Sequence, residues 1–399
     1  MKPNPPHPQA RLSFPFTLHP PPSTLVLALA VLLAACVGGP SGEAFLYVNA
    51  PLTGEMASRG QEIAGGVRLL ADEVNRQGGL LGRRVIVRAQ DDGGDAEGAV
   101  QAATRVVEAV RKGETVVGVV GHYNSGASIP SSRILAPAGI LMVTPGSSNP
   151  LLTKQSFRTV FRVVSTDDLQ GPLDARLALA QGWQRLALVH TDNAYARGLA
   201  ETFRNEYQSR GGTLLMDVEL PYNRLDRFLA QLPSVVRDVN RLGPQAIFFS
   251  GDYPEGIPLL RALRESGFAG GFMSGDSVVS DEFIDELGSM AEGAILSNIQ
   301  PAIDAVATPE FRAAYQRLEQ RRPGNDSVTG YSAAQVVVAG VKAAGAFDGR
   351  RAGDSLRSLT VTTLANGEWR ANDEGDMQVR PIWFFRVEGG RFVQIGEQR

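Results

Sequence analysis

Two serines stand where the sequence can build a binding site for a carboxylate. Ser125 follows Val116–Val120, an apolar run that predicts a strand buried on both faces, and it opens a segment that predicts a helix. At the start of a helix, a serine hydroxyl and unbonded backbone N–H groups converge on one anion. The competing interpretation is that Ser125 only caps its helix.

A second loop offers groups of the same kind. Ser148 follows the predicted strand Ile140–Val143 and supplies another hydroxyl and another N–H. Its alternative role is that of a turn residue beside Pro145 and Pro150. The two loops together predict an anion site made of neutral donors.

Enzyme chemistry is disfavoured by what surrounds the candidate motifs. Gly275-Asp276-Ser277-Val278 is similar to the nucleophile motif of some esterases, but their mechanism needs a histidine base downstream, and no histidine follows His190. The first strand is followed by Asn49-Ala-Pro-Leu-Thr-Gly54, with a proline in place of a dinucleotide-binding glycine turn, and a Walker-type loop is missing. We expect a binding protein without a cofactor, and not an enzyme.

The histidines and the cysteine do not predict a metal site. The four histidines, His7, His19, His122 and His190, show no paired ligand spacing, and Cys36 is the only cysteine. His122 follows a buried strand without an acid or nucleophile beside it in the sequence. We therefore interpret His122 as a buried, hydrogen-bonded residue.

Cys36 closes the sequence Leu33-Ala-Ala-Cys at the end of the uncharged run Leu25–Ala35. This run is too short to span a bilayer as a helix, which needs about twenty residues, but it is typical of an export signal. We predict a lipoprotein signal peptide at residues 1–35, a lipidated Cys36 and a short tether at residues 36–42. The alternative is an ordinary signal peptide with a chance cysteine. The mature chain is then expected outside the cytoplasm, in the cell envelope or periplasm, held to a membrane by lipid.

The net charge of the chain disfavours nucleic acid as a partner. The 399 residues carry a formal net charge of −3, and removal of residues 1–35 takes away Lys2 and Arg11 and no acid, which leaves −5. A mildly acidic protein is a poor binder of nucleic acid. Because a lipidated Cys36 leaves no thiol for a disulfide, packing alone must stabilise the fold.

Short β-branched runs alternate with helical stretches along the mature chain. Strands are predicted at 45–48, 84–87, 116–120, 140–143, 185–190, 246–250 and 294–297, and helices between them, for example at 63–74. This alternation is typical of a parallel α/β architecture, and it has too many units for one compact sheet. We therefore expect two lobes.

The two predicted lobes are not separated by a flexible linker. We assign residues 43–166 and 301–378 to lobe I, and residues 167–300 and 379–399 to lobe II. The expected hinge strands are Thr166-Asp167, Ile299-Gln300 and a segment near Val379. Short crossing strands of this kind permit the lobes to close on a ligand.

A series of short motifs extends along nearly the whole mature chain. In order they are Asn49-Ala-Pro-Leu-Thr-Gly, Gly78-Gly-Leu-Leu-Gly-Arg, Asp91-Asp, Gly121-His, Thr144-Pro-Gly-Ser-Ser-Asn-Pro, Phe161-Arg, Asp168-Leu-Gln-Gly-Pro, Asp252-Tyr-Pro-Glu, Ala291-Glu-Gly and Tyr331-Ser-Ala-Ala-Gln. No single motif is specific, but in this order and spacing they resemble the leucine/isoleucine/valine-binding proteins of ABC importers. The resemblance implies a two-lobed type I periplasmic binding fold, each lobe a mostly parallel sheet flanked by helices, with a ligand cleft between the lobes.

The resemblance also implies roles for individual residues. Ser125 would bind the carboxylate of the ligand, with Ser148 as a second donor, and the carbonyl of Gly146 would accept from its ammonium. Asp276 would neutralise that ammonium, because an unpaired ion in a closed cleft costs several kcal/mol. Tyr195 would pack on the ligand, or alternatively on its own helix.

Three charged residues depart from the family pattern. Arg59 and Asp252 stand where relatives place aromatic residues of the side-chain pocket, and Asp326 falls near another aromatic position. Either the ligand has a polar side chain, or Arg59 pairs with Asp252 across the lobes and helps hold the closed state. The remaining alternative is that all three are solvated rim residues. The disulfide positions of the family fall at about Gly94 and Asn124, and neither is cysteine.

The expected function is that of a monomeric substrate-binding lipoprotein of an ABC importer. It would capture an amino acid, branched-chain or more polar, or a small amide, and deliver it to membrane permease subunits. The alternative is a receptor in which the same fold senses such a ligand and signals to a partner protein.

Overall fold

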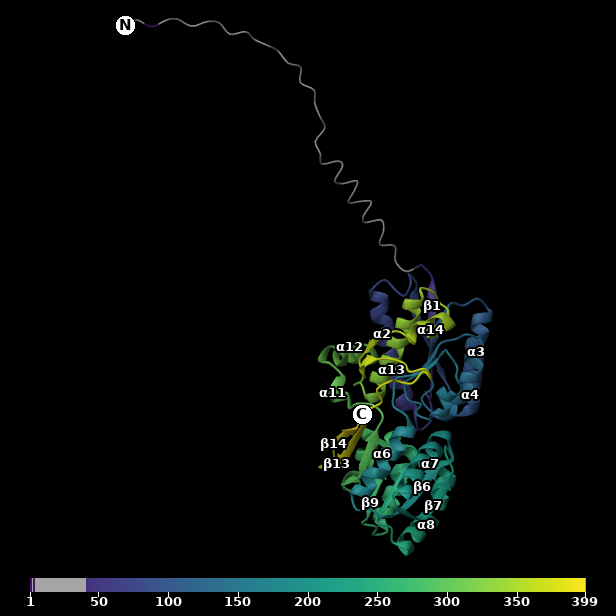
Figure 1. Ribbon diagram of the computed structural model, residues 1–399, viewed down its shortest axis with the longest axis vertical. Coiled ribbons are helices and arrows are strands. Elements are labelled where there is room, and N and C mark those ends of the chain that lie inside the picture. The colour runs from purple at the N-terminus through teal and green to yellow at the C-terminus, as the bar shows by residue number, and fades with distance from the viewer. Residues whose placement is uncertain (2, 4–40, 399) are drawn as a thin grey trace.

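The structure, a computed structural model, describes residues 1, 3 and 41–398. The predicted signal peptide, Cys36 and most of the predicted tether lie outside the described residues. Two sheets, each with its own helices, follow one another along the long axis of the molecule (Figure 1). The predicted α/β fold class is confirmed.

The first sheet is built from the first part of the chain. Its strands are β1 (Glu43–Ala50), β2 (Arg84–Asp91), β3 (Val116–Gly121), β4 (Met142–Thr144) and β5 (Val160–Arg162). They lie in the order β2-β1-β3-β4-β5, and all neighbours are parallel. The helices α2 (Ala57–Arg76), α3 (Ala96–Arg111), α4 (Ser125–Leu135) and α5 (Leu151–Lys154) alternate with these strands.

A later part of the chain returns to this first sheet. It comprises α11 (Ile303–Val306), α12 (Pro309–Glu319), α13 (Asn325–Ala344), α14 (Gly349–Leu356) and the hairpin β11 (Val361–Thr363) and β12 (Gly367–Trp369). Helix α13 packs closely on α2, because a Cβ on Gly66 would lie 2.1 Å from the carbonyl oxygen of Ser327. Trp369 Nε1 donates to the carbonyl of Arg162 at 2.9 Å and fixes the hairpin to β5.

The second sheet has seven strands. They are β6 (Arg185–Thr191), β7 (Thr213–Leu220), β8 (Ala246–Ser250), β9 (Gly271–Ser274), β10 (Ile295–Asn298), β13 (Ile382–Val387) and β14 (Phe392–Gln398). The order is β14-β13-β10-β9-β8-β6-β7, and only the β10–β13 and β13–β14 pairs are antiparallel. The flanking helices are α6 (Asp167–Ala180), α7 (Ala194–Ser209), α8 (Leu225–Leu242), α9 (Tyr253–Glu265) and α10 (Asp281–Leu287), with short turns η1 (Asp276–Val278) and η2 (Gly288–Ala291).

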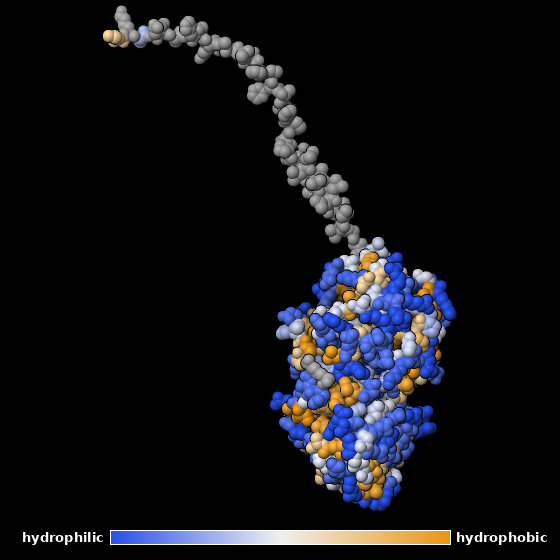
Figure 2. Space-filling model, viewed as in Figure 1, coloured by the Kyte–Doolittle hydropathy of each residue, from blue (hydrophilic) through white to orange (hydrophobic). Residues whose placement is uncertain are grey.

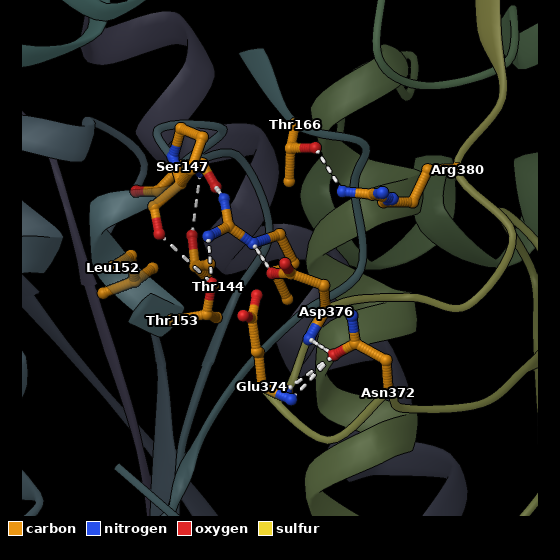
Figure 3. A network of polar contacts seen from close by, with 12 residues as sticks. Thr144, Ser147, Leu152, Thr153, Thr166, Asn372, Glu374, Asp376 and Arg380 are labelled. Carbon is orange, nitrogen blue, oxygen red and sulfur yellow. Dashed lines mark hydrogen bonds and ion pairs between the residues drawn. The ribbon is translucent and has the colours of Figure 1, made fainter. Parts of the chain in front are cut away.

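The chain passes between the two sheets at three places, and the three segments lie side by side. The backbone N–H of Ser165 donates to the carbonyl of Ile299 at 3.3 Å, and its hydroxyl donates to the carbonyl of Pro381 at 2.6 Å. Arg380 donates to the Thr166 hydroxyl at 2.9 Å (Figure 3). These are the segments in which hinge strands are predicted, and the exact lobe boundaries stay a prediction.

In the part of the chain that the structure describes, no helix has both the length and the apolar character that a membrane crossing requires. The face of the molecule seen in Figure 2 is largely hydrophilic, with smaller apolar patches.

Candidate ligand-binding cleft

A small cavity lies where the two sheets face each other. Its lining comes from the segments that follow β3, β4, β6, β8 and β9: Tyr123, Asn124, Ser125, Gly146, Tyr195, Asp252, Asp276 and Ser277. Ligands of parallel α/β proteins bind at such carboxyl ends of strands. The structure thus brings together five of the predicted site residues, from both sheets, while Ser148 and Arg59 lie outside this lining.

Ser125 is the first residue of α4 and is buried, with 1% of its surface exposed. Its hydroxyl oxygen accepts a hydrogen bond from the backbone N–H of Asn149 at 3.2 Å, and it makes no capping bond to its own helix. The capping interpretation is therefore wrong. The hydroxyl hydrogen and the first N–H groups of α4 remain as donors beside the cavity.

The loop after β4 reaches the cavity through Gly146. A Cβ at this position would lie 2.5 Å from the Tyr123 ring, so only glycine fits without displacing a wall of the cavity. Ser148 is buried but does not line the cavity. Its carbonyl accepts a hydrogen bond from the N–H of Asp167 at 3.1 Å. Ser148 therefore connects this loop to the start of α6, at one of the crossing segments.

Arg162, fully buried on β5, holds this loop in place through Ser147, Thr153 and Asp376, which Figure 3 labels. Its guanidinium donates to the carbonyl of Ser147 at 2.7 Å, to the carbonyl of Asn149 at 3.1 Å and to the Thr153 hydroxyl at 3.0 Å. Its Nε donates to Asp376 Oδ1 at 2.6 Å, so the charge is paired as well as hydrogen-bonded. The sequence analysis noticed Phe161-Arg162 only as a motif and missed this role, since Asp376 is more than two hundred residues away.

His122 is a second buried residue that holds the loop after β4 in place. His122 Nδ1 lies 2.6 Å from Asp92 Oδ2, and both side chains are fully buried. The carbonyl of His122 accepts from the Thr144 hydroxyl at 2.6 Å and from the Ser147 hydroxyl at 3.2 Å. The prediction of a buried, hydrogen-bonded histidine is confirmed, and its acidic partner comes from a loop that the sequence does not place beside it.

Asp276 and Tyr195 form the opposite wall. The Tyr195 hydroxyl donates to Asp276 Oδ1 at 2.9 Å, so Tyr195 reaches from α7 to the end of β9 and does not merely pack on its own helix. Burial raises the pKa of Asp276 to about 6, although hydrogen bonds from Tyr195 and Gln170 favour the ionised form. A ligand cation would restore the ionised form of this carboxyl.

Asp252 is the second carboxyl of the cavity and is 1% exposed. Its Oδ1 accepts a short hydrogen bond from the Ser277 hydroxyl, and its Oδ2 has no hydrogen-bond partner. Burial raises the pKa of Asp252, while the Ser277 hydroxyl, the positive charge of Arg59 and the Tyr222 hydroxyl act against that rise.

Arg59, on α2, pairs with Asp326 on α13, with Nη1 and Oδ2 2.9 Å apart. Its Nη2 donates to the carbonyls of Ser277 and Val279, at 3.1 and 3.0 Å, across the cleft. The alternative of a pair with Asp252 is therefore wrong, because the close packing of α2 on α13 brings Asp326 nearer. Arg59, Asp252 and Asp326 are at most 6% exposed, so the solvated-rim interpretation is wrong too.

Further contacts hold the two sides of the cavity together. Asn149 Nδ2 donates to the carbonyl of Ala194 at 2.7 Å, and the Tyr253 hydroxyl donates to the carbonyl of Glu55 at 2.6 Å. Asn124, one of the two positions of the family disulfide, donates from Nδ2 to the Tyr222 hydroxyl at 3.2 Å. The two sides of the cleft are therefore in direct contact.

A Cβ on Gly94, the other disulfide position, would lie 3.3 Å from Asn124 Oδ1. The two positions are thus neighbours in space. Within residues 41–398, no group of three or more His, Cys, Asp or Glu side chains is arranged to hold a metal ion.

The model of a family described as "Periplasmic binding protein" matches residues 48–391 of this chain. The chain belongs to this family. A relative from Rhizobium johnstonii, "Leu/Ile/Val-binding protein BraC3", is 31% identical over 378 residues, which cover 93% of this chain and 99% of the relative. An "Amino acid binding protein" from Pseudomonas aeruginosa is 30% identical, over 93% of this chain and 97% of the relative.

Solved structures agree with this placement. A leucine binding protein from Thermotoga maritima superposes with a TM-score of 0.77 at 26% identity, over 89% of this chain and 98% of the other. The resemblance to leucine/isoleucine/valine-binding proteins and the prediction of a binding protein in place of an enzyme are confirmed. Membership of a periplasmic family also implies that this binding protein works outside the cytoplasm.

Proposed function

We propose that this binding protein is the substrate-binding lipoprotein of an ABC importer and that it captures an amino acid, branched-chain or more polar, in the cavity described above. Several relatives carry the name of leucine/isoleucine/valine-binding proteins, which supports an amino-acid ligand. Cys36 would anchor the chain to a membrane, and permease subunits would receive the ligand.

The observation that carries the proposal is the opposition of neutral donors and an acid across one closed cavity. On one side, the Ser125 hydroxyl and the first N–H groups of α4 suit a carboxylate. On the other side, Asp276 suits an ammonium, and the carbonyl of Gly146 can accept a further N–H. A zwitterion placed between them would satisfy both walls at once.

Capture would follow from closure. In this proposal, the lobes are residues 43–166 with 301–378 and residues 167–300 with 379–399, and they rotate about the three adjacent crossing segments. A ligand that touches both lobes stabilises the closed form by its differential affinity for that form. The permease would then recognise the closed shape.

Isothermal titration calorimetry of the purified protein against the twenty amino acids and small amides tests the proposal. We expect binding with one site per chain and, in scattering measurements, a decrease of the radius of gyration on binding. Absence of heat for every zwitterion in such a library would overturn it. A ligand that is bound without an importer encoded beside the gene would favour the receptor alternative instead.

A further inference from the structure

Asp252 remains without a function once the head group of an amino acid has been given its partners. In the proposed function, which this inference extends, Ser125 faces the carboxylate and Asp276 faces the ammonium. Asp252 lines the same cavity, and its Oδ2 is buried without a hydrogen-bond partner. A buried acceptor left unpaired is costly, so a ligand atom that donates to Oδ2 would bind strongly.

The protein itself does not supply that donor. The Nη atoms of Arg59 are committed to Asp326 and to the carbonyls of Ser277 and Val279, so Arg59 attracts Asp252 only through space. The Tyr222 hydroxyl acts on the Asp252 carboxyl and opposes the rise of its pKa, but Oδ2 has no hydrogen-bond partner. A ligand can therefore supply the donor that Oδ2 lacks.

The rest of the lining agrees with a polar ligand. The eight lining residues comprise two tyrosines, two aspartates, two serines, one asparagine and one glycine, and none has an aliphatic side chain. The side chain of leucine would find no aliphatic wall here, and it would leave Asp252 unpaired.

We propose that the cavity selects an amino acid whose side chain ends in a hydrogen-bond donor, an ammonium or an amide NH2, and that Asp252 binds this donor. The ligand then spans the cavity between three polar partners, with its carboxylate at Ser125, its ammonium at Asp276 and its side-chain donor at Asp252. Asp252 is accordingly the residue that determines specificity.

Calorimetry with leucine, asparagine and 2,4-diaminobutyrate tests the proposal on the full chain and on Asp252→Asn and Asp252→Leu. We expect the wild type to prefer asparagine or diaminobutyrate over leucine by about 100-fold or more, as sites built for a polar group do. Asp252→Asn retains an acceptor, so it should weaken diaminobutyrate by about tenfold or more and asparagine much less. Asp252→Leu should weaken both and improve leucine.

Asp226→Asn, on the exposed side of α8, is the matched control and should leave every affinity unchanged. The response to Asp252→Asn separates a cationic donor from an amide donor. Wild-type protein that binds leucine as tightly as the polar ligands, with the ranking unchanged in Asp252→Asn, would overturn the inference and leave the proposed function intact. If no amino acid binds at all, the proposed function fails with it. If Asp252→Leu does not fold, the wild-type ranking and the isosteric Asp252→Asn decide.

Discussion

The two walls of the cavity are built on opposite principles. The wall from the first sheet offers neutral donors, and a dense network around Arg162 and His122 supports it from behind. The wall from the second sheet offers carboxylates whose pKa values burial raises. In the first wall the carbonyls that hold the loop have hydrogen-bond partners, whereas in the second wall the buried Asp252 Oδ2 has none.

We infer that the first wall contributes the rigidity of the site and that the second wall contributes its affinity for the ligand. The hydrogen bonds of Arg162 fix the loop that carries Gly146 and Ser148, which limits what closure has to order. In the second wall, in contrast, burial disfavours the ionised carboxylates until a ligand donor or cation pairs with them. We expect changes in the first wall to affect stability and changes in the second wall to affect binding.

The largest effect is expected from Arg162→Met. The substitution leaves Asp376 buried without its partner and three acceptors of the loop without a donor, so the free energy of unfolding should fall by about 3–5 kcal/mol. Chemical denaturation measures it. The control is Arg158→Met, which breaks an exposed pair with Asp354 and should cost less than about 1 kcal/mol. Equal losses in both variants would contradict the supporting role of Arg162.

Asp276→Ala tests the second wall. It removes the proposed partner of the ligand ammonium, and loss of a buried charge pair should weaken amino-acid binding by about 100-fold or more in calorimetry. The melting temperature of the unliganded protein should stay nearly unchanged, because relief of the unfavourable burial of this carboxyl offsets loss of the hydrogen bond from Tyr195. Asp226→Ala is the control. A large fall in the stability of the empty protein would show that Asp276 is structural.

Arg59→Met tests the contact between the walls. Arg59 donates to two carbonyls of the opposite side, so its loss should favour the open form and weaken all ligands by a similar factor of about ten. Small-angle scattering should show a more open empty protein. Arg76→Met, which breaks an exposed pair on the same helix, is the control. A change in the ranking of ligands, without a common weakening, would instead make Arg59 a specificity residue.

The smallest effect is expected from pH. Asp276 has a raised pKa of about 6 in the empty protein, and a bound ammonium would lower it, so binding releases a proton. Affinity should therefore rise with pH and be about tenfold weaker at pH 5 than at pH 7. Calorimetry across this range measures it, and the profile should flatten in Asp276→Asn. An affinity that increases as the pH falls would contradict the assigned role.

Sequence patterns were sufficient for the alternating α/β order and for the strands that are buried on both faces. The predicted strands at 116–120, 185–190 and 246–250 appear as β3, β6 and β8. A continuous apolar run is typical of a strand that is buried on both faces of a sheet. The short strands β5 and β9 and the half-exposed β7 were not predicted, since their residues carry too weak a pattern. Their positions follow from pairing with neighbours that are distant in the sequence.

The sequence by itself determined that Ser125 begins a helix after a buried strand and that the chain carries acids where an apolar pocket was expected. Only the tertiary structure decided which partners these residues have. Arg59 binds Asp326 because the two helices that carry them, both containing glycine, pack closely. Asp252 keeps one oxygen without a partner because the Ser277 hydroxyl donates only to Oδ1. Partner choice depends on distances of a few ångströms between segments far apart in the chain, and no local pattern of residues encodes those distances.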